Sequence, residues 1–170
     1  MLGAAILVYN WLHKRSALGP VIMGVCRFLV YAIAALSAGG GGIAVVLGAL
    51  GLLCHVVGLT YAAKQEAYNT FGAAWPLIVM TVPVGMGAWM ADESMAWLFL
   101  AGYVGWGVFA LRLLFRRQPG DVPKAVVNLI AAISLYDATL VASAGAYGLA
   151  VLAMAAFGAT LVLQRVAPGT

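Results

Sequence analysis

Long apolar runs dominate the sequence, and short polar or glycine-rich segments separate them. A helix needs about 20 apolar residues to cross the hydrocarbon core of a bilayer, and no run alternates as a membrane β-strand does. The pattern therefore predicts an all-α fold, a polytopic transmembrane helical bundle of about seven helices that forms one domain over residues 1–170. The predicted helices are Leu2–Leu12, Leu18–Ser37, Ile43–Ala63, Trp75–Ala91, Met95–Phe115, Ala125–Ser143 and Ala146–Gln164.

The first predicted helix is too short to cross a membrane alone. Leu2–Leu12 rises only about 17 Å, whereas the hydrocarbon core is about 30 Å thick. No basic segment precedes it, as one would in a signal peptide. We expect a truncated transmembrane helix, preceded in a longer protein by an N-terminal part. A short, tilted or re-entrant helix is the alternative.

Composition agrees with a membrane protein. Hydrophobic residues make up 65% of the chain and charged residues only 8%, whereas a soluble domain has about 25% charged residues. These values exclude a water-soluble enzyme, a nucleic-acid-binding protein and a disordered regulator. Cys26 and Cys54 lie inside apolar runs, so we interpret them as buried hydrophobic residues rather than a disulfide or metal ligands.

Basic residues gather in alternate loops. The second, fourth and sixth predicted loops, which include Gly39–Gly42 and Asp92–Glu93, contain no Lys or Arg. Because basic loops stay on the cytoplasmic side, the other loops and the C-terminus are predicted to be cytoplasmic, and we place the protein in a bacterial inner membrane. The basic residues on that side are Lys14, Arg15, Lys64, Arg116, Arg117, Lys124 and Arg165.

Two groups of polar residues lie at the predicted cytoplasmic ends of helices. Tyr9, Lys14 and Arg15 end the first helix, and cations with a phenol suit a phosphate ligand. Tyr61, Lys64 and Glu66 lie at the end of the third helix and just after it, and Glu66 is able to bind a divalent cation or an amine. By spacing alone, anchoring by positive charge and an aromatic belt is the favoured explanation of the first group. Solvation by lipid headgroups explains the second.

Three ionisable residues lie deeper in predicted membrane helices. An unpaired arginine at the bilayer centre costs at least about 2.5–3.5 kcal/mol, so we expect Arg27 to face the bundle interior and find an acceptor. Asp137 and Asn128 are the available acceptors, and His55 lies at a similar depth. The alternative for these residues is a buried polar pair that only fixes helix packing.

Several of these segments, taken in order, resemble the UbiA-type prenyltransferases. Residues 9–15 (YNWLHKR) and 19–27 (GPVIMGVCR) look like the family's Y-x-x-x-K-R stretch and its next helix, with one extra residue between Tyr9 and Lys14. Residues 60–66 (TYAAKQE) are similar to the T-Y-x-A-R-x-E form of a divergent branch, and Asn128–Asp137 to a late helix of that branch.

The resemblance implies a function that composition alone does not. Members of the family are all-helical intramembrane enzymes that transfer a prenyl group from an isoprenyl diphosphate to a lipophilic or aromatic acceptor, with Mg²⁺ holding the diphosphate. It implies that the diphosphate is bound by Tyr9, Lys14, Arg15, Arg27, Tyr61 and Lys64. It also implies a pocket lined by His55, Asn128 and Asp137, and a metal ligand at Glu66. No catalytic residue is assigned.

The sequence departs from the family at two places. The motif N-D-x-x-D-x-x-x-D would precede Met1, and Gly58 stands where a carboxylate is usual. One carboxylate at Glu66 cannot replace a cluster that binds two Mg²⁺ ions. We therefore expect this chain to be inactive alone, as a fragment, a pseudoenzyme or one half of a split protein. The alternative functions are a non-catalytic membrane protein and a transporter subunit with a buried polar relay.

Overall fold

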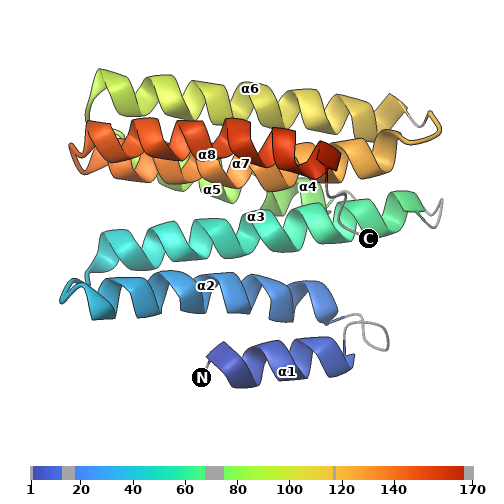
Figure 1. The fold of residues 1–170 in the computed structure, drawn as a ribbon, viewed down its shortest axis with the longest axis horizontal. Helices are drawn as coiled ribbons and strands as arrows, with labels where there is room; N and C mark the ends of the chain where they lie inside the picture. Colours follow the sequence, from blue (N-terminus) through green and yellow to red (C-terminus); the bar gives the residue numbers. More distant parts are fainter. Residues whose placement is uncertain (1, 13–17, 68–74, 117, 167–170) are drawn as a thin grey trace. The chain divides into compact units, whose positions relative to one another are not determined.

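The computed structural model describes residues 2–12, 18–67, 75–116 and 118–166. Every regular element in these ranges is an α-helix, which confirms the all-α prediction. The helices are α1 (Leu2–Leu12), α2 (Gly19–Ser37), α3 (Ile43–Ala67), α4 (Trp75–Val79), α5 (Val82–Met90), α6 (Ser94–Arg116), α7 (Asp121–Ser143) and α8 (Tyr147–Val166), as Figure 1 shows.

Five of these helices are long and apolar enough to cross a membrane. Each of the five contains at least 18 consecutive residues of high mean hydropathy with few charges, which matches the thickness of a bilayer core. The chain is therefore a membrane-embedded, polytopic helical protein. The five segments are Gly19–Ser37, Ile43–Ala62, Ser94–Arg116, Asp121–Ser143 and Tyr147–Gln164.

The predicted continuous helix Trp75–Ala91 is wrong, because the structure breaks it at Met80 and Thr81. Pro83 has no N–H, and its ring would clash with the carbonyl four residues earlier in a continuous helix. The Thr81 hydroxyl instead donates to the Ile78 carbonyl over 2.7 Å. The Thr81 backbone N–H donates to the same carbonyl over 3.0 Å. A break is tolerated in a membrane helix because Thr side chains and local turns with shorter backbone bonds satisfy the groups around it.

The chain forms two compact units. Unit 1 covers Met1–Lys64 and Phe71–Met86, and unit 2 covers Gln65–Thr70 and Gly87–Thr170. Each unit has its own helix contacts and its own buried residues. The single domain over residues 1–170 stays a prediction.

Glycines set the closest helix contacts in unit 1. A Cβ atom on Gly24 would lie 2.9 Å from the Val57 side chain and 3.1 Å from the Leu53 carbonyl oxygen. The backbone of α2 at Gly24 therefore lies directly against α3. A Cβ atom on Gly58 would lie 2.8 Å from the Pro76 carbonyl oxygen. Small residues permit such approaches in membrane helices, where packing rather than water expulsion drives association. Gly58 is therefore explained by the packing of α3 on α4.

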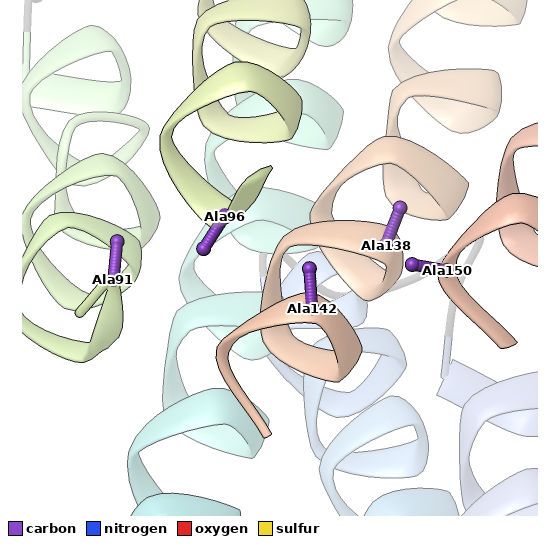
Figure 2. Packing of buried hydrophobic residues seen from close by; sticks show 5 residues of the cluster. All are labelled: Ala91, Ala96, Ala138, Ala142 and Ala150. Atoms are coloured by element: carbon purple, nitrogen blue, oxygen red, sulfur yellow. The ribbon is translucent and has the colours of Figure 1, made fainter. Parts of the chain in front are cut away.

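In unit 2, α7 packs against both α6 and α8 and is the most enclosed helix of the three. At one end of these helices, the core of unit 2 is a cluster of alanines with almost no exposed surface (Figure 2). A hydrogen bond joins two further segments: the Tyr147 hydroxyl donates to the Glu93 carboxylate and links the start of α8 to the segment before α6. The cluster consists of Ala91, Ala96, Ala138, Ala142 and Ala150.

An ion pair closes the turn between α6 and α7. The Nε and Nη2 atoms of Arg116 each donate to one Asp121 carboxylate oxygen over 2.8 Å, and the Gln118 backbone N–H donates to the same carboxylate. The Asp121 side chain is 1% exposed, whereas that of Arg116 is 51% exposed. Gly120 adopts φ +84° in the turn, a conformation that favours glycine. The pair therefore fixes a tight antiparallel hairpin.

Replacing Asp121 by asparagine is expected to lower the melting temperature of the purified protein by several degrees. The neutral side chain cannot hold the Arg116 guanidinium through two charged hydrogen bonds, and the position of Asp121 is buried although Arg116 is half-exposed. The check is thermal unfolding in one detergent, with Arg116→Gln and the double variant completing a cycle. Equal melting temperatures for Asp121→Asn and the parent protein would contradict the expectation.

Candidate functional site

A groove between α1 and α2 brings two of the predicted phosphate-binding residues together. Tyr9 on α1 and Arg27 on α2 both line this cavity of about 240 Å³ in unit 1. The two helices lie beside each other in Figure 1. The remaining lining residues are apolar or weakly polar: Leu2, Ile6, Met23, Cys26 and Val30.

The spacing of the lining residues explains why the groove forms. Leu2, Ile6 and Tyr9 recur every three to four residues on α1, and Met23, Arg27 and Val30 do so on α2. Residues three or four apart lie on one helix face. Each helix therefore lines the groove with one stripe of side chains. Tyr9 is the polar residue of the α1 stripe, and Arg27 is the charged residue of the α2 stripe.

Arg27 carries an uncompensated charge inside this groove. It lies about 12 Å along α2 from Gly19, within a segment apolar enough to span a membrane. The residue is exposed. The expectation that it faces the bundle interior stays a prediction. No carboxylate among the described residues pairs with it. Its expected pairing with Asp137 or Asn128 stays a prediction, because both lie in unit 2.

The other predicted diphosphate ligands are only partly described. Lys14 and Arg15 lie outside the described residues, as does the side chain of Glu66. Tyr61 packs edge-on against Trp75, with ring centroids 4.8 Å apart, and so joins the end of α3 to the start of α4. Lys64 is half-buried one turn further along α3.

The predicted pocket residues are divided between the units. His55 is 1% exposed in α3 of unit 1. Asn128 and Asp137 belong to α7 of unit 2, and nine residues of helix place them on opposite sides of it. One face of α7 therefore cannot present both to one pocket. Neither unit contains all three residues of the alternative polar relay, because Arg27 and His55 belong to unit 1 and Asp137 belongs to unit 2.

The described residues do not fit a magnesium site. No group of three or more His, Cys, Asp or Glu side chains comes together in the described ranges. Mg²⁺ prefers an octahedron of oxygen ligands from carboxylates, substrate phosphates and water. No chemical step is therefore assigned to a metal.

A second cavity of about 180 Å³ lies between α2 and α3. Its lining side chains are apolar, and none of them carries a charge or a titratable group. It includes the glycine-rich segment 40–42, which joins the two helices. The α1–α2 groove, which has a guanidinium and a phenol, is therefore the stronger candidate for chemistry.

Sequence reasoning predicts only Tyr9 and Arg27 of the residues that line the α1–α2 groove, and it misses Leu2, Ile6, Met23, Cys26 and Val30. A usable signal exists for two of them, because Met23 and Val30 lie four residues before and three residues after Arg27, and residues at that spacing share a helix face. The comparisons with known proteins add no relative, since no family model, curated protein or solved structure matches the chain.

Proposed function

We propose that the chain is part of an intramembrane prenyltransferase whose α1–α2 groove binds an isoprenyl diphosphate. In this proposal Arg27 and Tyr9 hold the diphosphate, and the prenyl chain lies along the apolar residues of the groove. The acceptor is a lipophilic or aromatic compound. The support for the whole chain is the motif resemblance, and the support for the groove is geometric.

One observation carries the proposal: in a segment apolar enough to span a membrane, a guanidinium with no carboxylate partner among the described residues lies in a groove lined otherwise by Tyr9, Cys26 and apolar side chains. A charge in that position is costly unless a counter-ion accompanies it. Guanidinium groups bind phosphate oxygens through paired hydrogen bonds, more specifically than an ammonium does. A ligand with an anionic phosphate head and a hydrocarbon tail satisfies both parts of the groove.

The proposed reaction is substitution at the allylic carbon of the diphosphate. The C1–O bond breaks, and its electron pair leaves on the diphosphate oxygen. An electron pair of the acceptor forms the new bond to C1, and the acceptor loses one proton. Arg27 would stabilise the charge that develops on the leaving group. The Tyr9 hydroxyl would donate a hydrogen bond to it, or its ring face would lie against the allylic cation.

The remaining assignments rest on the resemblance alone. Lys14, Arg15, Tyr61 and Lys64 would add diphosphate contacts, and Glu66 would contribute to binding Mg²⁺, which would neutralise diphosphate charge when bound. The cytoplasmic placement of the basic loops and a bacterial inner membrane belong to the proposal in the same way.

Replacing Arg27 by glutamine is expected to weaken binding of farnesyl diphosphate at least about tenfold, because a charged hydrogen bond to phosphate contributes about 1.5–3 kcal/mol. Binding is measured on the full chain in nanodiscs, so that a deficit in turnover does not obscure it. Arg27→Lys keeps the charge and should recover part of the affinity. Val25→Ala changes an exposed residue of the same helix that does not line the groove, and should bind like the parent.

The outcomes separate the candidate functions. Equal affinity in the parent and in Arg27→Gln would remove the proposed diphosphate site. Binding of farnesyl diphosphate without formation of a prenylated product, when an aromatic acceptor and Mg²⁺ are supplied, would favour a non-catalytic membrane protein. Ion or solute flux through vesicles that depends on Arg27, His55 and Asp137 would favour the transporter subunit.

A further inference from the structure

The turn end of the α6–α7 hairpin carries more positive charge than Asp121, the carboxylate at that end, neutralises. Both Asp121 oxygens accept from Arg116, and the Gln118 N–H also donates to this carboxylate. Lys124 lies within electrostatic reach of the same carboxylate. Arg112, one turn before Arg116, has no carboxylate partner among the described residues. The hairpin therefore presents a positive excess on a surface that belongs to unit 2.

Arg112 lies on an exposed, amphipathic stripe of α6. Val108, Phe109 and Phe115 are 43%, 45% and 49% exposed, and their helical spacing places them on the same side as Arg112 and Arg116. Arg112 itself is exposed, about 6 Å along the helix from its end at Arg116. The stripe thus combines apolar and aromatic side chains with guanidinium groups within about two turns.

The depth of Arg112 restricts what can neutralise it. It lies inside a segment apolar enough to span a membrane, where a long basic side chain extends towards the level of the lipid phosphates. A guanidinium binds phosphate oxygens in a paired geometry. Val108 and Phe109, one turn deeper, lie at the level of acyl chains. This order of groups along α6 matches the order of groups in a phospholipid.

Net charge decides between phospholipid classes. A zwitterionic headgroup carries its own ammonium, which would lie near the cations of the hairpin. A net anionic headgroup compensates the positive excess, and each Lys or Arg near an anionic surface contributes about 1 kcal/mol of attraction, or about a fivefold gain in affinity.

We propose that this stripe of α6, together with Lys124, binds an anionic glycerophospholipid, with the lipid phosphate at Arg112 and Lys124 and the acyl chains against Val108 and Phe109. The site is separate from the α1–α2 groove and does not depend on the proposed prenyl transfer, because the two sets of residues belong to different units.

The test uses the full chain in nanodiscs of phosphatidylcholine alone or mixed equally with phosphatidylglycerol. Native mass spectrometry after release counts retained lipid, and thermal unfolding reports stabilisation. The parent protein should retain phosphatidylglycerol preferentially and melt at a higher temperature in the mixture. Arg112→Gln should lower the preference about fivefold and Arg112→Gln/Lys124→Gln more than tenfold. Arg112→Lys should keep most of it.

Controls make each result decisive. Gln118→Ala changes an exposed, uncharged side chain of the same turn and should retain the lipid like the parent. Equal melting temperatures in phosphatidylcholine would show that the variants fold alike. If Arg112→Gln does not fold, the preference of Lys124→Gln for phosphatidylglycerol is measured instead, and it should be about fivefold lower than that of the parent protein. Unchanged preference in the double variant would overturn the proposal. So would a preference that is lost with Arg27→Gln instead, or one that inorganic phosphate abolishes.

Discussion

Replacing Gly58 by valine is expected to lower the free energy of unfolding by at least about 3 kcal/mol. The added Cβ would lie 2.3 Å from Cγ of Met80 and 2.8 Å from the Pro76 carbonyl oxygen. The Met80 side chain is able to move, but the Pro76 carbonyl belongs to the backbone of α4. Relief therefore requires α3 and α4 to separate. The melting temperature of the purified chain in one detergent checks this, with an expected decrease of roughly 6–12 °C.

The control for Gly58 is a glycine in open space. A Cβ atom on Gly105 of α6 would meet no neighbouring atom within 4 Å, so Gly105→Ala should leave stability unchanged or raise it by about 0.5–1 kcal/mol. The double variant Gly58→Ala/Met80→Ala should recover only part of the stability that Gly58→Ala alone loses, because the Pro76 carbonyl remains 2.8 Å from the added Cβ. Full recovery would show that side-chain crowding alone, and not helix separation, explains Gly58.

Replacing Ala138 by leucine is expected to destabilise unit 2 by about 1–3 kcal/mol or more. Ala138 is 0% exposed, and its neighbours in the cluster are alanines whose short side chains let the helices approach (Figure 2). The additional carbon atoms of leucine have no free volume there, so α7 must shift against α6 or α8. Thermal unfolding reports the global loss, and protease cleavage of unit 2 locates it.

The matched control for Ala138 is a leucine at an exposed alanine of α8. Ala155 is exposed, and the substitution only adds apolar surface where lipid or detergent accepts it. Ala155→Leu should therefore melt like the parent protein. Similar losses for Ala138→Leu and Ala155→Leu would mean that the alanine cluster is not a packed core.

Helix identity is accessible from the sequence because hydropathy is a local property. The limits of α1, α2 and α3 agree with prediction to within a few residues. The start of α7 is predicted at Ala125, four residues late, because Lys124 and Pro123 have the composition of a loop. Proline is tolerated in the first turn of a helix, where its missing N–H has no partner in any case. The break at Met80 and Thr81 is missed although Pro83 signals it.

The candidate site is predicted less well, because its residues meet only through tertiary contacts. Tyr9 and Arg27 are both candidates from the sequence, but their common groove follows from the packing of α1 on α2. Burial of Arg27 is expected from the cost of an isolated charge, and that expectation assumes a protein acceptor. Its exposed position needs an acceptor from outside the described residues.

The ion pair of Arg116 and Asp121 shows the same limit at short range. The sequence pattern marks Arg116 as a basic loop residue and gives no sign that Asp121 is its partner. The two residues are five positions apart, and the turn at Gly120, which has a positive φ, brings their side chains together. A count of charges along the sequence does not reveal this turn geometry.

By itself, the sequence determined the medium and the element type of this protein: apolar runs of membrane length must form helices, because only a helix satisfies its own backbone hydrogen bonds in lipid. The tertiary structure alone decided which glycines and alanines lie in close helix contacts, and which charges among the described residues lack a carboxylate partner. Those properties depend on distances between helices, and residues far apart in sequence set these distances by packing.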